Sequence, residues 1–355
     1  MAMDPIKTKK KIESDYTEYL SSILQVRDDE INKKTKVAIK TGRFVKGPYL
    51  EATLPFTAGM SLKELADKDI ISREFECIRE DIHYERPLYY HQQKAVEKLS
   101  GEDKNIIVAT GTGSGKTECY MFPIFNYLMR EKEAGKLGPG VRALLLFPMN
   151  ALANDQVKKL RQLLANYPDI TFGRYTGETE RTKTEEEVRK EYKLEHGEDA
   201  LPNEMLTRKR MQNTPPHILL TNYAMLEYLL LRPTDSELFD GSNAKSWKFI
   251  VIDEAHTYKG SNGTEIAILL RRLKERINKH SDNKLTCVAT SATLGSEDAK
   301  DALATFAENI FDEPFMPEDI VTASRIRRKM EANMTALMPE DYVTLKTKVA
   351  AMEGD

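Results

Sequence analysis

A glycine-rich run that ends in lysine and threonine is the first candidate site in the sequence. Residues 109–117 read ATGTGSGKT, after the apolar residues 106–108 and before a segment whose apolar residues recur with helical spacing. Glycines let consecutive backbone N–H groups turn toward one anion, because they adopt positive φ and carry no Cβ. The amino end of the following helix adds unpaired N–H groups. The run therefore predicts a loop that binds a triphosphate.

Within this loop the side chains have distinct expected roles. Lys116 is placed to reach the β- and γ-phosphates, and Thr117 offers its hydroxyl to Mg²⁺. Thr110 stands where the strict pattern has glycine, but Gly111 follows directly and lets the loop turn. A glycine-rich turn with an incidental lysine is the alternative, and the strand–loop–helix context argues against it. The residues expected to hold ATP here are Thr112, Gly113, Ser114, Gly115, Lys116 and Thr117.

Two adjacent carboxylates form the second candidate site. Asp253 and Glu254 follow the apolar run 249–252 directly, and the carboxyl ends of parallel strands face the ligand crevice in such folds. We expect Asp253 to hold Mg²⁺, mostly through water, and Glu254 to polarise the attacking water. His256 either connects this site to a neighbouring motif or caps the turn. Lys116, Asp253, Glu254 and His256 form the expected catalytic set.

Short apolar runs that alternate with helical patterns must position these residues. This alternation begins at Pro87 and favours βαβ units with a mostly parallel sheet covered by helices on both faces. The sequence therefore predicts an α/β fold, a three-layer P-loop domain. The runs expected to form strands are residues 105–109, 141–147, 170–175, 217–220, 249–252 and 285–289.

Changes in composition divide the chain into expected parts. Residues 1–86 are expected to form a helical accessory region, with helical spacing around Tyr16, Tyr19, Leu20 and Ile23. Residues 87–310 are expected to form the ATP-binding domain. Inside it, residues 179–212 are highly charged and predict an inserted, solvated helical pair, with strand separation or partner binding as the alternative role. Residues 311–355 are expected to form a helical tail.

Overall composition excludes several classes of protein. The 355 residues have a net charge of -3 and 40% apolar content, which is enough for a packed core. The sequence contains no apolar run long enough for a membrane span and no secretory signal pattern at its amino end. Its three cysteines form no C-x-x-C pair, which argues for a reducing, cytoplasmic environment and against a zinc site in this chain.

The motifs together resemble those of superfamily 2 helicases of the DEAD/H-box type. Residues 253–256, DEAH, resemble motif II of that family, and the glycine-rich loop resembles its motif I. Residues 88–92 resemble the Q motif, in which Gln92 would read the adenine edge. The resemblance covers about residues 87–300. It implies a RecA-like domain that binds ATP and Mg²⁺.

Further motifs of this family appear in the expected order and imply nucleic-acid contacts. Residues 147–152 resemble motif Ia, 175–177 motif Ib, 220–223 the next strand-end motif and 291–293 motif III. Ser291 and Thr293 would couple ATP to strand movement. Each short motif alone also fits an ordinary strand-end turn. The residues that the resemblance assigns to nucleic-acid backbone contacts are Pro148, Met149, Asn150, Thr176, Gly177, Thr221 and Asn222.

Several stretches in and around these motifs are similar in sequence to large bacterial helicases related to the mitomycin-repair helicase. This group includes the motor proteins of DISARM- and Druantia-type phage defence. The similar stretches are residues 47–49, 148–156, 174–179 and 221–233. This resemblance implies the N-terminal motor half of an ATP-dependent DNA helicase or translocase in phage defence or DNA repair. An RNA helicase and an ATP-gated scaffold in a defence complex stay open as alternatives.

Motors of this family cleave ATP between two RecA-like domains, and the second one supplies an arginine finger. No Q-x-x-G-R-x-x-R-like motif occurs in the sequence. We therefore expect a second RecA-like domain, in cis or in trans, as a partner. Nucleic acid, DNA before RNA, and other defence subunits are the further expected partners. By itself the chain is expected to hydrolyse ATP very slowly.

Overall fold

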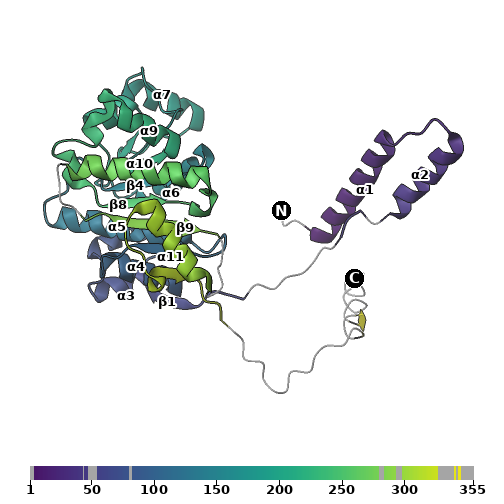
Figure 1. Ribbon diagram of the computed structural model, residues 1–355, viewed down its shortest axis with the longest axis horizontal. Helices are drawn as coiled ribbons and strands as arrows, with labels where there is room; N and C mark the ends of the chain where they lie inside the picture. Colours follow the sequence, from purple (N-terminus) through teal and green to yellow (C-terminus); the bar gives the residue numbers. More distant parts are fainter. Residues whose placement is uncertain are drawn as a thin grey trace. The chain divides into compact units, whose positions relative to one another are not determined.

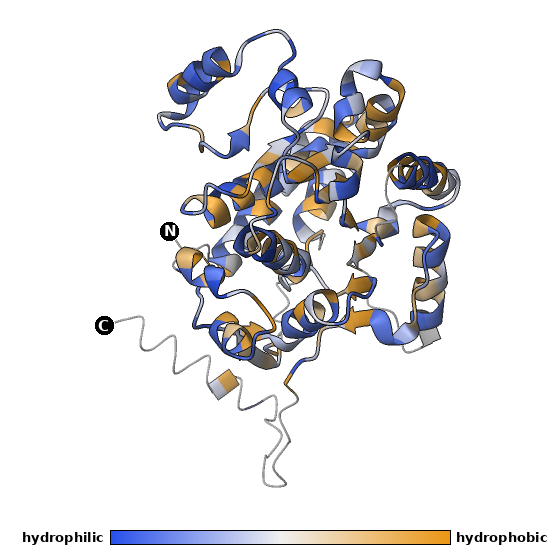
Figure 2. Cartoon of the chain, turned by 90° about the vertical axis from the view of Figure 1, so that its left-hand side faces the viewer, coloured by the Kyte–Doolittle hydropathy of each residue, from blue (hydrophilic) through white to orange (hydrophobic). Residues whose placement is uncertain are grey.

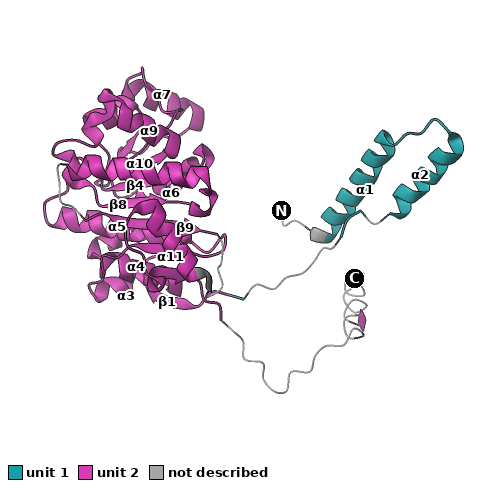
Figure 3. Cartoon of the chain, in the orientation of Figure 1, with its two compact units in different colours: residues 1–54 teal, residues 55–355 magenta. Residues whose placement is uncertain are grey.

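The computed structural model divides the chain into two compact units, Met1–Leu54 and Pro55–Asp355 (Figure 3). It describes residues 4–42, 44–46, 54–79, 82–279, 284–292 and 298–326, together with 340 and 343–344. The first unit contains helices α1 (Pro5–Ile23) and α2 (Asp29–Thr41). Each begins at an aspartate whose carboxylate accepts hydrogen bonds from the first turn, Asp4 and Asp28. The helix predicted around Tyr16 is therefore present.

An eight-stranded sheet forms the centre of the second unit, and all of its pairings are parallel. The strand order is β10-β3-β9-β8-β4-β7-β5-β6. Six of the eight strands were predicted from apolar runs. The strands are β3 (Ile106–Ala109), β4 (Ala143–Phe147), β5 (Phe172–Arg174), β6 (Glu204–Met205), β7 (Ile218–Asn222), β8 (Phe249–Ile252), β9 (Thr286–Ser291) and β10 (Ile320–Thr322).

Helices cover both faces of this sheet and give the predicted three layers (Figure 1). Residues of one strand alternate between two core clusters, with Ile106 and Val108 in one and Ile107 in the other. The first cluster includes α4 (Tyr90–Ser100), α5 (Lys116–Glu133) and α6 (Asn150–Leu164), and the second α9 (Tyr223–Leu231), α10 (Ser261–Asn278) and α11 (Asp298–Phe311). Figure 2 shows that helices of the chain carry both hydrophilic and hydrophobic residues, as amphipathic helices do.

The expected boundary at residues 86 and 87 is wrong, since the second unit begins at Pro55. Helix α3 (Leu62–Asp67), capped by Ser61, and the 3₁₀ helix η1 (Arg73–Ile78) bury Leu62 and Phe75 in the same core cluster as α4 and α5. Strands β1 (Ala58–Ser61) and β2 (Pro87–Tyr89) pair across the expected boundary. The unit also extends beyond residue 310, because β10 pairs with β3.

The charged insert differs from the predicted helical pair. Helix α7 (Glu185–His196) buries none of its residues, as predicted for a solvated helix. The insert then adds the buried strand β6 to the sheet edge and continues into α8 (Arg208–Asn213). None of the described helices has the length and apolar character needed to cross a membrane. The remaining short 3₁₀ helices are η2 (Pro233–Leu238), η3 (Asn243–Ser246), η4 (Ala255–Thr257) and η5 (Pro317–Asp319).

Candidate functional site

The predicted motifs gather at one edge of the sheet, where the parallel strands end. The glycine-rich loop follows β3, motif III follows β9, and the two acids follow β8; these three strands are neighbours. The motif Ia, strand-end and Ib residues end or follow β4, β7 and β5, which form the adjacent half of the sheet. The ATP motifs and the nucleic-acid motifs thus lie in two adjacent groups at the carboxyl ends of the strands. Ligands bind at this end of the strands in open α/β sheets.

Two glycines shape the loop after β3. Gly113 and Gly115 have φ of 73° and 76°, in the left-handed region that favours glycine. Any other residue at position 115 would be strained by this φ, and its Cβ would lie 2.2 Å from the Nε2 atom of Gln92, which would have to shift. The buried Thr110 and Ser114 hydroxyls form a hydrogen bond of 2.6 Å that ties the two ends of the loop together.

The Q-motif segment packs directly against this loop. The Gln92 side chain donates from Nε2 to the Gly115 carbonyl at 3.2 Å and accepts from the Tyr89 backbone N–H at 2.9 Å. His91, which is buried, contacts the Ser114 carbonyl through Nε2 at 2.8 Å. A cavity of about 370 Å³ lies beside Tyr89, Gln92 and Gly115. Its position next to the loop suits a nucleotide base, and adenine reading by Gln92 stays a prediction.

The lysine of the loop meets the second acid of the DEAH run. The Lys116 ammonium, at the start of α5, lies 2.9 Å from Glu254 Oε1. Glu254 has a left-handed backbone with φ of 50°, which is uncommon for a residue other than glycine and is typical of functional sites. His256 Nδ1 lies 3.2 Å from the second oxygen of the Glu254 carboxylate. Two motifs that are 138 residues apart therefore converge on one point.

Asp253 is held by a residue that the sequence analysis did not select. The Thr290 hydroxyl donates to the Asp253 carboxylate and accepts from the Glu254 backbone N–H, the latter at 3.0 Å. Burial raises the pKa of Asp253, and the neighbouring Glu254 charge adds to the rise. A buried carboxylate beside a second acid suits a divalent cation. Thr290 directly precedes the expected coupling residue Ser291, and its position at the end of a strand was the only signal available.

Two further contacts at the end of β9 involve backbone groups. The Ser291 carbonyl accepts from the Thr110 N–H at 3.1 Å, and the Ala292 N–H lies 3.5 Å from His256 Nδ1. His256 therefore contacts motif III, which is one of the two roles considered for it. Thr293 lies outside the described residues.

The residues of this half fit the phosphates of ATP and a magnesium ion. A Cβ on Gly111 or Gly113 would meet nothing within 4 Å, so the outer side of the loop is open to a ligand. The Lys116 ammonium supplies positive charge. The half-buried Thr117 hydroxyl and the Asp253 carboxylate supply the hard oxygen ligands that Mg²⁺ prefers. These residues are the ones expected to hold the nucleotide and the metal.

In the other half, the threonines hold the loops instead of facing solvent. Thr176 and Thr221 are fully buried, and the Thr221 hydroxyl donates to the Tyr175 carbonyl at 2.6 Å. Their hydroxyls therefore do not face a strand, which differs from the expected direct contact. Gly177 is exposed. Met149 is exposed too, while Pro148, Asn150 and Asn222 are half-buried.

The insert supplies a further positioning residue, Arg208. Its guanidinium is buried and donates to the backbone carbonyls of Thr176 at 2.6 Å and Thr179 at 3.1 Å, with Gly177 at 3.4 Å. Burial lowers the pKa of Arg208. The group also lies 5.1 Å from the centre of the Tyr175 ring. The motif Ib loop is therefore fixed from behind by the insert. No sequence signal distinguishes Arg208 from the neighbouring basic residues.

Comparison with known proteins agrees with this arrangement. The profile of the DEAD/DEAH box helicase family matches residues 89–302, more than half of the chain. Druantia protein DruE of Escherichia coli (strain UMEA 4076-1) is 30% identical over 98% of this chain and 23% of its own length. The uncharacterized ATP-dependent helicase YprA of Bacillus subtilis (strain 168) is 31% identical over 59% of this chain and 23% of its own length.

Solved structures share the fold. DUF1998 helicase MrfA bound to DNA superposes with a TM-score of 0.54 at 25% identity, over 76% of this chain and 31% of that protein. DEAD-box helicase Mss116 has a TM-score of 0.52 at 21% identity and shows the same RecA-like fold. The chain spans about a quarter of DruE and a third of MrfA. The family match and the convergence of Lys116 with the DEAH acids place the chain in the DEAD/DEAH box helicase family.

Proposed function

We propose that this chain is the ATP-binding, N-terminal motor domain of an ATP-dependent DNA helicase or translocase that acts in phage defence or DNA repair. The distance of 2.9 Å between Lys116 Nζ and Glu254 Oε1, beside Asp253, carries the proposal. An ammonium for phosphate, a carboxylate for metal and a carboxylate for water must meet at one point for phosphoryl transfer to water.

Each residue of this point has a proposed task. Lys116 neutralises charge on the β- and γ-phosphates, and Asp253 with Thr117 orients the magnesium ion. Glu254 accepts a proton from, or positions, the attacking water. The magnesium ion, when bound, neutralises charge that develops on the phosphate oxygens. His256 contacts both Glu254 and the Ala292 N–H, so it is suited to relay the state of this site to motif III, where we assign coupling to Ser291 and Thr293.

The adjacent half of the edge is suited to hold a strand by its backbone. Gly177 is exposed, and the half-buried side chains of Asn150 and Asn222 lie beside it at the ends of these strands; backbone and amide groups of this kind bind phosphate without reading bases. DNA is favoured over RNA because MrfA, which is 25% identical to this chain, has been solved bound to DNA. A second RecA-like domain and a cytoplasmic location belong to the same proposal.

A comparison of ATP hydrolysis with different strands tests this function. The full-length protein is assayed with single-stranded DNA, duplex DNA and RNA side by side, and stimulation by DNA is the expected result. The Lys116→Ala variant should lose Mg-ATP binding in a nucleotide titration. Hydrolysis that no nucleic acid stimulates would favour the scaffold alternative, and stimulation by RNA alone would favour the RNA helicase.

A further inference from the structure

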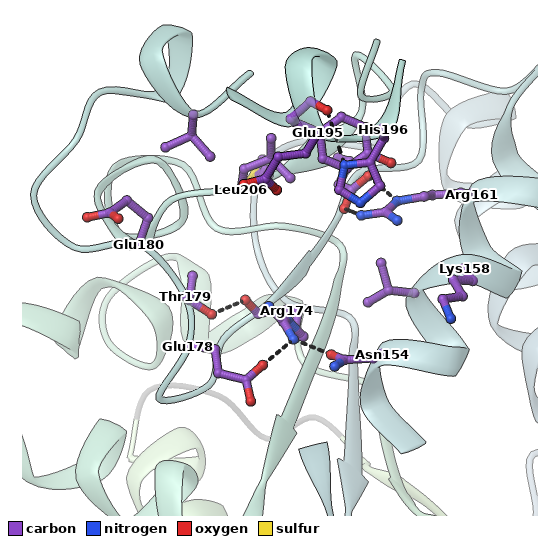
Figure 4. A pocket seen from close by; sticks show the side chains of 15 residues that line it. Asn154, Lys158, Arg161, Arg174, Glu178, Thr179, Glu180, Glu195, His196 and Leu206 are labelled. Carbon is purple, nitrogen blue, oxygen red and sulfur yellow. Dashed lines mark hydrogen bonds and ion pairs between the residues drawn. The ribbon is translucent and has the colours of Figure 1, made fainter. Parts of the chain in front are cut away.

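Donor groups from the end of a strand and the start of a helix converge on the carboxylate of Glu178. Arg174 Nη1 donates to one carboxylate oxygen at 2.8 Å, and Asn150 Nδ2 donates to the other at 3.0 Å. Arg174 ends β5, and Asn150 begins α6. In Figure 4, Arg174 lies between Asn154 and Glu178 at the side of a cavity of about 440 Å³. Each carboxylate oxygen thus has one donor.

A backbone N–H fixes the direction of these donors. Asn222 caps α9, and its Oδ1 atom accepts from the Met225 N–H at 2.8 Å. Its Nδ2 group is therefore the donor in the bond of 2.7 Å to Asn150 Oδ1. Because the amide oxygen of Asn150 accepts that bond, its Nδ2 group points toward Glu178. The hydrogen bonds therefore all donate in one direction, from Met225 through Asn222 and Asn150 to the carboxylate of Glu178.

The same donors suit a phosphate. A guanidinium binds carboxylate and phosphate in similar geometry, and an amide N–H donates to either. The location is also appropriate, since Glu178 follows the exposed Gly177 among the loops assigned to backbone contacts. The Glu178 side chain is 53% exposed and that of Arg174 27%. Arg174 is also held by a hydrogen bond to Asn154, so the carboxylate is the freer partner.

We propose that Arg174 and Asn150 bind one phosphate of the nucleic-acid backbone, and that Glu178 fills this site as an internal competitor until a strand displaces it. The inference rests on the proposed strand-binding function. It adds Arg174 to the contact residues and gives Glu178 a defined role. Displacement weakens binding equally for every base sequence, which suits a motor that must release each phosphate after binding it.

Anisotropy of a labelled oligothymidylate, titrated with this chain, tests the proposal. Glu178→Gln should tighten binding about two- to five-fold, the range of an exposed ion pair. Arg174→Gln should weaken binding and lower the slope of log affinity against log salt by about 0.7, the value for one phosphate of a single strand. A thermal unfolding curve for each variant shows that it is folded.

Two further variants separate competition from general charge. Glu178→Gln in the Arg174→Gln background should give a smaller gain, because only the Asn150 donor is then freed. Glu227→Gln is the matched control: its side chain is 51% exposed and pairs with Arg272 at 2.8 Å, and it should leave affinity unchanged. An equal gain from Glu227→Gln, an undiminished gain without Arg174, or weaker binding by Glu178→Gln would each overturn the proposal.

Parallel titration with a fluorescent ATP analogue distinguishes failure of the proposed phosphate site from failure of the proposed strand-binding function. Strand binding that does not respond to Arg174 refutes this inference and leaves the proposed function in place. Intact nucleotide binding with no strand binding by any variant refutes the strand-binding function, and this inference with it.

Discussion

Replacing Glu254 with glutamine should tighten Mg-ATP binding while it stops turnover. In the structure the Glu254 carboxylate pairs with the Lys116 ammonium, the group assigned to the phosphates. ATP must take this ammonium from Glu254, so the carboxylate competes with the ligand. Glutamine keeps the size and one acceptor oxygen of the side chain but loses the charge. It therefore competes less and cannot accept the proton of the attacking water.

The burial of the pair sets the size of the effect. The side chains are 10% and 22% exposed, so solvent screens their charges only in part. A hydrogen bond between charged groups contributes about 1.5–3 kcal/mol and a neutral one about 1. The loss in the free protein is therefore roughly 0.5–2 kcal/mol, or about two- to thirty-fold tighter Mg-ATP binding. Loss of the general base should lower turnover by about 10²–10⁴-fold.

Equilibrium titration with a fluorescent ATP analogue measures the first effect, and turnover in the full-length protein measures the second. The control compares the double variant with Lys116→Ala alone: the double variant should bind Mg-ATP no better than Lys116→Ala, because no ammonium is left for the removal of the Glu254 charge to free. Unchanged or weaker affinity in the single variant would refute the competition argument. Normal turnover would remove Glu254 from its catalytic role.

Three further substitutions have defined outcomes. Arg208→Met should lower the free energy of unfolding by about 3 kcal/mol in urea titration, because the buried carbonyls of Thr176 and Thr179 lose their donor. A loss under 0.5 kcal/mol would contradict the role of Arg208 in holding the motif Ib loop. Thr290→Val should weaken Mg-ATP binding at least several-fold, since it frees the Asp253 carboxylate while keeping the side-chain shape. Burial lowers the pKa of His217 to about 4, and its Nδ1 accepts from the Thr171 N–H at 3.0 Å. The unfolded chain therefore binds this proton at a higher pH than the folded protein does, and up to about 3 kcal/mol of stability is lost as pH falls from 6.5 to 4. His217→Gln should make the free energy of unfolding less dependent on pH in this range. An unchanged pH dependence would show that His217 is not its source.

Sequence patterns predicted most of the sheet because central parallel strands are apolar on both faces. The runs before the glycine-rich loop and before the DEAH acids each became a strand. Strands β6 and β10 were not predicted, since two or three residues give no periodic signal. The boundary near residue 86 was misplaced because turn residues in that region resemble a linker. The apolar residues Leu62 and Phe75 join the main core only through tertiary packing.

The candidate site was predictable where chemistry requires fixed residue types. Lys116, Asp253 and Glu254 stand out by type and position, and the structure brings them together. Thr290 and Arg208 were missed because their partners are selected by the fold, at separations of 37 and 29–32 residues. A threonine at a strand end and an arginine in a charged helix are common features of any sequence.

The parallel sheet also sets a fixed distance between the proposed nucleotide site and the proposed nucleic-acid site. Adjacent strands lie about 4.8 Å apart, so the ends of β3 and β5, five strand spacings apart in the order of the sheet, are about 24 Å from each other. A hydrogen-bonded sheet packed on both faces does not stretch as nucleotide is consumed. Movement of a nucleic-acid strand relative to the nucleotide must then come from the loops at the carboxyl ends of the β-strands, or from another domain that closes against these loops.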